Sequence, residues 1–133
     1  MKTSIRKINY YWLIAGIVNL LTALIHTFGG QLDLVNPLLK SNLADQTKAE
    51  WFGVWHLVTL LLFATSYEIL RNTLVAVQVR KSEIITSIGY LYILFSIPFI
   101  VTSFYFSLLA PQWILLLPIG LLILFGKEKE KMK

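Results

Sequence analysis

Two histidines, His26 and His56, are the side chains whose type and spacing could do chemistry in this sequence. An imidazole binds metals and haem iron and exchanges protons near neutral pH. His26 lies close to the end of one long apolar run, and His56 lies shortly after the start of the next. Because a helix rises about 1.5 Å per residue, two antiparallel helices would bring both rings to a similar depth. Ionisable groups inside a membrane usually face a bundle interior or a wet cavity, so this depth predicts a shared site.

Small and polar residues around the histidines recur at helical spacing, as at close helix contacts in membranes. One stripe in the first apolar run contains Gly16, Asn19, Ala23, His26 and Gly30. A second stripe contains Gly53, His56, Thr59 and Ser66, and a third contains Gly89, Tyr92, Ser96, Phe99 and Ser103. If the histidines converge, the predicted ligand-binding residues are His26, His56, Asn19, Thr59, Trp51 and Trp55.

Three interpretations of the histidine pair stay open. Polar side chains between membrane helices often serve only as hydrogen-bonding partners that hold the helices together. A second interpretation is a bound ligand, and a third is a proton relay or a catalytic role.

The available donors limit the ligand chemistry. A structural zinc ion needs four protein ligands and a catalytic one three, so His26 and His56 would need Asp33 or Glu50 to complete a metal site. Haem iron needs only two axial histidines, although helices packed about 8 to 10 Å apart leave little width for a porphyrin. A small polar ligand or a quinone headgroup hydrogen-bonded between the two rings needs the fewest additional ligands and the least space.

Other signatures of catalysis are missing from the sequence. It contains no H-E-x-x-H, no G-x-S-x-G and no phosphate-binding glycine loop. It has no cysteine, which excludes a disulfide scaffold, a thiolate metal cage and a thiol nucleophile. A small transporter that exchanges protons would need an acidic residue at the membrane midplane, whereas Glu68 lies toward a helix end beside Arg71. These absences speak against an enzyme and leave a small transporter as a further alternative.

The composition indicates that the histidines lie on membrane helices. Of the 133 residues, 56% are apolar and 14% are charged, and the mean hydropathy is +0.68. A soluble domain has about 45 to 50% apolar and about 25% charged residues, so a water-soluble globule is excluded. At roughly 20 apolar residues per crossing, the sequence predicts one all-α domain over residues 1–133, an integral membrane four-helix bundle. The expected spans are residues 10–29, 48–70, 84–109 and 113–126.

The first two spans are joined by a Leu-rich external connection, residues 31–50. Asn36 and Pro37 are expected to begin a short helix there that buries the leucines. The stretch from Thr47 to Glu50 fits a capping box at the start of the second span.

The last two spans carry further local signals. Pro98 should bend span 84–109, and a tight turn at residues 110–112 should make the last two spans antiparallel neighbours. Span 113–126 is almost entirely aliphatic, which predicts the most lipid-exposed helix. Glu68 and Arg71, three residues apart, are expected to pair.

The net charge of +5 is distributed over alternate connections. Basic residues precede the first span (Lys2, Arg6, Lys7), lie between the second and third (Arg71, Arg80, Lys81), and follow the last (residues 127–133). Lysine and arginine are retained on the cytoplasmic side of a membrane, so we expect a multi-pass protein of the inner membrane with both termini in the cytoplasm. A continuous basic stripe for phosphate contacts is absent, which argues against nucleic acid as a partner.

Two segments, Ile25-His26-Thr27-x-Gly29-Gly30 and Trp51-x-x-x-Trp55-His56-x-x-Thr59, resemble a pattern of small, uncharacterised four-span bacterial membrane proteins. The resemblance covers the first half of the chain. It implies the four-span topology and a bacterial inner-membrane location, and it implies no activity. In size and number of spans the chain is also similar to the DoxX-like group.

These observations predict a small integral membrane protein that acts as a binding or accessory subunit. The alternative is a membrane haem, redox or small-ligand protein that uses His26 and His56. The expected partners are the lipid bilayer and either a small polar ligand or another membrane protein. Because the three stripes can be used within one bundle, we expect a monomer or a weak homodimer.

Overall fold

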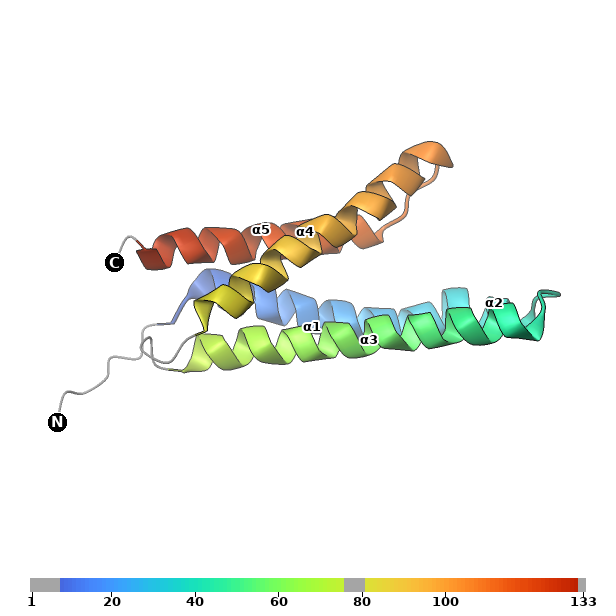
Figure 1. The fold of residues 1–133 in the computed structure, drawn as a ribbon, viewed down its shortest axis with the longest axis horizontal. Helices are drawn as coiled ribbons and strands as arrows, with labels where there is room; N and C mark the ends of the chain where they lie inside the picture. The colour runs from blue at the N-terminus through green and yellow to red at the C-terminus, as the bar shows by residue number, and fades with distance from the viewer. Residues whose placement is uncertain (1–7, 76–80, 132–133) are drawn as a thin grey trace.

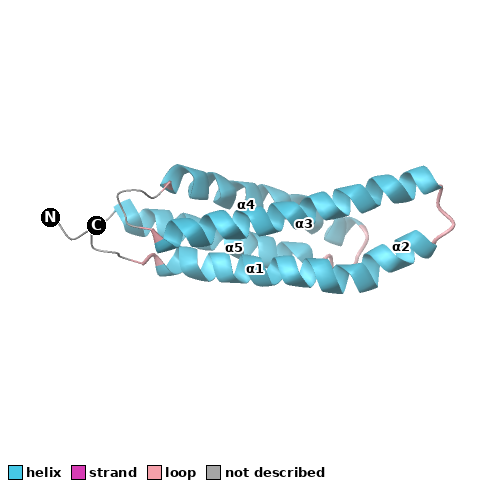
Figure 2. Cartoon of the chain, turned by 90° about the horizontal axis from the view of Figure 1, so that it is seen from below, coloured by secondary structure: helices cyan, strands magenta, loops and turns pink. Residues whose placement is uncertain are grey.

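The chain folds into helices joined by short connections, and the described part contains no strand (Figures 1 and 2). The computed structural model describes residues 8–75 and 81–131, so the predicted basic residues Lys2, Arg6, Lys7 and Arg80 lie outside it. The helices are α1 (Tyr10–Gly30), the π-helical turn η1 (Gln31–Val35), α2 (Asn36–Lys40), α3 (Asp45–Leu74), α4 (Ser82–Tyr105) and α5 (Gln112–Lys131). The prediction of an all-α protein is therefore confirmed.

The four long helices, α1, α3, α4 and α5, alternate in direction (Figure 1). Asn9 Nδ2 donates to the Gly126 carbonyl oxygen at 2.9 Å, which places the start of α1 beside the last turns of α5. At the same end, the Lys81 backbone N–H donates to Asn72 Oδ1 at 2.9 Å. The end of α3, the start of α4 and the two ends of the described chain thus lie on one side, called the inner side below.

Three helical segments within the described residues are long and apolar enough to cross a membrane. They are Tyr10–Lys40 with 31 residues, Asp45–Leu74 with 30 and Ser82–Tyr105 with 24. α5 is not among them, because its apolar part ends at Gly126 and the residues from Lys127 onward are charged.

The first connection differs from the prediction. α1 continues through η1 into α2, so Asn36 and Pro37 extend an existing helix. The widened turn of η1, in which Asn36 N–H bonds to the Gln31 carbonyl, stands directly before Pro37, whose ring crowds the turn that precedes it. The expected burial of the leucines is wrong: Leu32, Leu34 and Leu39 are exposed, and the buried residue is Val35.

The predicted capping box is also wrong, because α3 begins at Asp45, before Thr47. Its N-cap, Ala44, has no side chain that could accept the hydrogen bond of a capping residue. Glu50 Oε1 instead accepts a hydrogen bond from Gln46 Nε2 at 2.7 Å. At the other end of α3 the predicted pair is present, with Arg71 Nη1 3.4 Å from Glu68 Oε1.

α4 and α5 are antiparallel neighbours, as predicted (Figure 1). Their backbones touch at two glycines, since a Cβ on Gly120 would lie 2.7 Å from the Gly89 carbonyl oxygen. The connection between them spans residues 106–111 and is longer than the expected turn. The expectation that residues 113–126 are the most lipid-exposed is wrong. α5 packs against both α1 and α4, so it contributes three residues to the core, namely Leu116, Ile119 and Ile123.

Asn19, Thr65 and Tyr92 form a buried hydrogen-bonded cluster, the central triad, that joins α1, α3 and α4. Asn19 Nδ2 donates to Thr65 Oγ1 at 3.0 Å, and the Tyr92 hydroxyl donates to Asn19 Oδ1 at 2.7 Å. The Tyr92 and Thr65 hydroxyl oxygens are themselves 2.7 Å apart. Three helices are therefore fixed in register at one level by polar side chains that satisfy one another.

We expect Tyr92→Phe to lower the free energy of unfolding by roughly 0.6 to 2 kcal/mol, because it leaves Asn19 Oδ1 without its donor. Tyr90→Phe is the matched control, since Tyr90 is exposed on the same helix. Reversible unfolding of the purified protein in mixed micelles measures both values. Equal stability of the two variants would contradict a structural role for the triad.

Candidate functional site

His26 is the predicted site residue with the most specific surroundings. Its ring stacks on the indole of Trp55, with centroids 3.9 Å apart and planes 11° from parallel. Its Nε2 atom lies 3.4 Å from the Trp55 carbonyl oxygen, and the side chain is half-buried between α1 and α3. One turn later on α1, a Cβ at Gly30 would overlap the Trp55 ring. Trp55 is therefore held between His26 and Gly30.

Thr59 belongs to the same group of contacts. It is buried, and its hydroxyl donates to the Trp55 carbonyl oxygen at 3.1 Å, the atom that His26 Nε2 also faces. Asn19 lies deeper, in the central triad, seven residues or about 10 Å along α1 from His26. The structure thus brings His26, Trp55 and Thr59 together and places Asn19 in a separate cluster.

His56 and Trp51 lie elsewhere. Both are exposed, and the His56 ring makes a T-shaped contact with Phe52, with centroids 4.3 Å apart. Successive residues of a helix are turned by about 100°, so the contact of Trp55 with α1 directs its neighbour His56 away from that helix. The two histidines consequently have different ring partners.

The predicted stripe on α3 is confirmed at Thr59 and Ser66, which are buried, and is wrong at Gly53 and His56, which are exposed. A Cβ at Gly53 would have no neighbour within 4 Å, so this glycine is not at a close contact. The residues of α3 that are buried are Thr59, Leu62, Thr65, Ser66, Ile69, Asn72 and Thr73. On α1 the predicted stripe is confirmed as an interface, since Gly16 meets Leu70 and Asn19 meets Thr65. On α4, Gly89, Tyr92 and Ser96 are buried as expected.

Sequence reasoning missed the partners that complete the polar contacts. Thr65 and Tyr92 were not among the predicted site residues, although Asn19 within an apolar run requires partners from neighbouring helices. It also missed Trp12, whose Nε1 donates to the Ile123 carbonyl oxygen at 3.0 Å and ties α1 to α5. A backbone acceptor carries no side-chain signal, so this bond could not be read from residue types.

The contacts of His26 are those of a packed side chain. Nε2 faces a carbonyl oxygen, so it is placed as the protonated donor nitrogen. One face of the ring is covered by Trp55. Within the described residues, no three His, Cys, Asp or Glu side chains lie close enough together to hold a metal ion.

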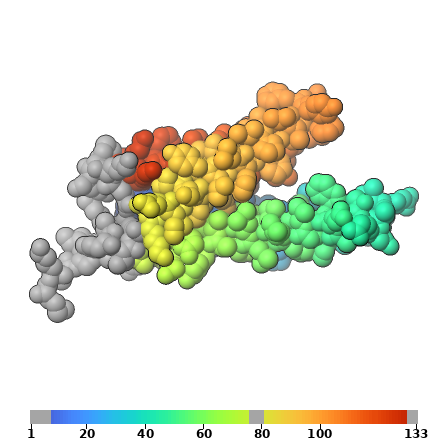
Figure 3. Space-filling view, viewed as in Figure 1, coloured from blue at the N-terminus to red at the C-terminus, as the bar shows by residue number. Residues whose placement is uncertain are grey.

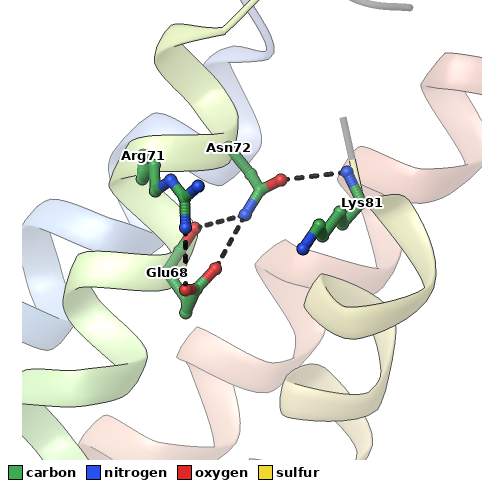
Figure 4. A network of polar contacts seen from close by, with 4 residues as sticks. All are labelled: Glu68, Arg71, Asn72 and Lys81. Atoms are coloured by element: carbon green, nitrogen blue, oxygen red, sulfur yellow. Dashed lines mark hydrogen bonds and ion pairs between the residues drawn. The ribbon is translucent and has the colours of Figure 1, made fainter. Parts of the chain in front are cut away.

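A second feature is an open face between α3 and α4. These helices are joined at the inner side by a polar network, in which Asn72 contacts Glu68 and Lys81 (Figure 4). Farther out, the central triad joins them again. Beyond the triad the two helices diverge, and the space-filling view shows a notch between them (Figure 3).

The walls of this notch are mostly apolar. Val58 and Phe99, each seven residues outward from the triad on its helix, are partly buried against the core. Farther outward on the same faces, Val54 and Thr102 are exposed. We call the space between Val54 and Val58 of α3 and Phe99 and Thr102 of α4 the wedge.

Comparisons of the chain with known protein families, curated proteins and solved structures find no match. No family, relative or known structure therefore supplies an activity. The contacts of His26 and the wedge are the features on which a function can be based.

We expect His26→Ala to lower the free energy of unfolding by roughly 0.5 to 1.5 kcal/mol, because the aromatic contact with Trp55 is lost. His56→Ala should change it by less than about 0.5 kcal/mol, as at other exposed positions. Because the two rings have different partners, the double variant should be additive within about 0.5 kcal/mol.

Reversible unfolding of the four proteins in micelles measures these differences, and the absorption spectrum of each shows whether a chromophore co-purifies. Strong coupling, or a chromophore that either substitution removes, would contradict a packing role and support a paired-histidine ligand site.

Proposed function

We propose that this chain is a small integral protein of the bacterial inner membrane that crosses the bilayer four times, with both termini in the cytoplasm. We further propose that it acts as an accessory subunit that receives a helix of another membrane protein in the wedge, and that it is a monomer or a weak dimer outside that complex. The observation that carries this proposal is the open apolar face between α3 and α4.

The distribution of charge along the helices supports the membrane placement. At about 1.5 Å per residue, Asp33 and Glu50 lie about 21 to 22 Å outward from the central triad. Glu83 lies about 13 Å to the inner side by the same count. Between these levels the described helices carry Glu68 and Arg71, which pair with each other, and Lys127 and Glu128, which lie within about 3 Å of the inner limit. A nearly uncharged layer of this depth matches a hydrocarbon core of about 30 Å.

The basic residues support the orientation. Arg71, Lys81, Lys127 and Lys129 all lie toward the inner side, where α3 and α5 end and α4 begins. The outer side carries Asp33, Asp45 and Glu50 with two lysines. Retention of positive charge in the cytoplasm favours the inner side as the cytoplasmic one.

The use of polar groups supports a binding role within the bilayer. Asn19, Thr65 and Tyr92 bond to one another, and His26 bonds and stacks within the chain. What the chain offers to a partner inside the membrane is therefore apolar surface. In a closed four-helix bundle, neighbouring helices pack along their length, whereas here α3 and α4 separate. A helix with its side chains is about 10 Å wide. The wedge begins where α3 and α4 are in contact and widens outward, so it suits one such helix.

The topology has a direct test. An alkaline phosphatase domain fused after Lys133 should be inactive, because both ends of the chain are expected in the cytoplasm. The same domain inserted between Asn42 and Leu43, in the outer connection, should be active. An active fusion after Lys133 would contradict four crossings with a cytoplasmic start.

The accessory role predicts a protein neighbour in the wedge. A photoreactive benzoylphenylalanine at Val54 should give one discrete protein adduct on illumination of intact membranes, because Val54 lines the wedge. The matched control is Leu60, which is 70% exposed on the same helix and, five residues from Thr65, is turned about 140° away from the face that meets Tyr92. It should give lipid adducts alone. Lipid adducts alone at both positions would contradict the accessory role.

A further inference from the structure

The connection between α4 and α5, residues 106–111, is the outer feature that the four-span arrangement leaves unexplained. We infer that this connection lies at the outer boundary of the hydrocarbon core, among the lipid headgroups and the upper acyl chains, with the start of α5 below it, and not in the water above the membrane. The inference rests on the membrane placement proposed above.

The first observation is the absence of charge. From Ile84 to Gly126 the sequence contains no Asp, Glu, Lys or Arg, and this stretch includes the whole connection. The outer end of the α1–α3 hairpin, residues 31–50, is of the opposite kind. Its helical turns on either side of residues 41–44 carry Asp33, Lys40, Asp45, Lys48 and Glu50. The two outer segments thus differ in charge. The uncharged composition of residues 106–111 is typical of a segment in contact with lipid, and the charged composition of the hairpin end is typical of a segment in water.

The second observation is depth. Gly120 of α5 contacts Gly89 and Ile93 of α4, which places it close to the level of Tyr92. α5 begins eight residues outward, at Gln112, so its first residue lies about 10 to 12 Å outward from the triad. A hydrocarbon core of about 30 Å that starts at Glu83 ends about 17 Å outward from the triad. α5 therefore begins several ångströms below that boundary, and the connection joins it to Tyr105 of α4, which lies about 20 Å outward from Tyr92 by the same count.

The shape agrees with this count. The end of the α1–α3 hairpin, at α2, reaches farther along the long axis than the connection between α4 and α5 (Figure 1). If the charged residues of that hairpin end lie at the membrane surface, the connection lies below it.

The third observation is that the connection satisfies part of its own backbone. Phe106 N–H donates to the Thr102 carbonyl, Ser107 N–H to Phe104, and Leu108 N–H to Ser103. Ala110 N–H donates to Ser103 Oγ at 3.0 Å. Pro111 has no N–H. Backbone polar groups near the hydrocarbon core need partners inside the protein, and here four of the amides have them.

The Ser103 side chain makes this closure possible. Its hydroxyl accepts from Ala110 N–H and donates to the Phe99 carbonyl oxygen at 2.7 Å. One side chain thereby replaces the water that an exposed connection would use.

The fourth observation is the outward surface of the connection. Phe104 and Tyr105 are 82% and 80% exposed, and Phe106, Leu108 and Leu109 are exposed as well. Large apolar side chains in one exposed group are unfavourable in water. The same group is stable against lipid, with the aromatic rings at the level of the headgroups.

The absence of native cysteine permits a direct measurement of depth. Single nitroxide labels would be placed at Leu108→Cys in the connection, Leu94→Cys on the exposed face of α4 near the triad level, and Asn42→Cys in the charged connection. The protein would be reconstituted in vesicles of phosphatidylethanolamine and phosphatidylglycerol. Collision rates with oxygen, which enters lipid, and with a nickel chelate, which stays in water, would then be compared.

We expect the ratio of oxygen to nickel-chelate collision rates to be at least several-fold higher for the label at Leu108 than for the label at Asn42. The ratio at Leu108 should fall between the values at Asn42 and Leu94. Phe106→Cys serves as the second label position if the Leu108 variant does not reconstitute. A nitroxide at position 108 that matches Asn42, while Leu94 reports lipid, would overturn the inference and leave the membrane placement intact. If Leu94 also matches Asn42, the membrane placement itself fails.

Discussion

A polar side chain in the bilayer core has no water to bond, so it must find its partners within the protein. Asn19 is the residue on which this requirement falls most heavily, because it is fully buried in the middle of an uncharged helix. Its amide nitrogen reaches Thr65 and its amide oxygen reaches Tyr92, so one residue of α1 sets the register of α3 and α4 together. The glycine and histidine contacts of α1 then follow at helical spacing on the same face.

The two ends of the bundle differ because polar contacts between α3 and α4 continue from the triad toward the inner side and not toward the outer side. At the inner side, Asn72 joins α3 to the start of α4, and Asn9 and Trp12 bond to backbone carbonyls of α5. Outward from the triad, His26 and Thr59 make their contacts between α1 and α3. They leave α4 without a polar link to α3 on that side within the described contacts. The wedge therefore opens where such links end.

The sequence was informative where residue size and polarity were uneven. The face of α1 could be predicted because small and polar residues interrupt an apolar run. The outer part of the α3 face was misassigned, because Gly53 and His56 share that pattern. The residue that meets α1 there is the large Trp55, which fits only because Gly30 has no side chain. The burial of α5 could not be predicted, since an aliphatic helix is equally suited to lipid and to the core. The candidate site shows the same pattern. His26 was predicted together with Trp55 and Thr59, its contacts on α3, whereas Thr65 and Tyr92, the partners of Asn19, were not predicted as site residues.

The length of α5 links the wedge to the position of the outer connection. Gly120 lies level with the segment from Gly89 to Ile93, so Gln112, eight residues farther along an antiparallel helix, lies near Pro98. Outward of Pro98, α4 has no stretch of α5 beside it. Pro98 also removes one backbone hydrogen bond from α4 at this level. The outer part of α4 therefore has neither α5 beside it nor, among the described contacts, a polar link to α3. As a result, it separates from α3. A longer apolar α5 would support α4 as far as Tyr105 and raise the connection toward the surface. The short α5 instead accounts both for the wedge between α3 and α4 and for the position of residues 106–111 below the end of the α1–α3 hairpin.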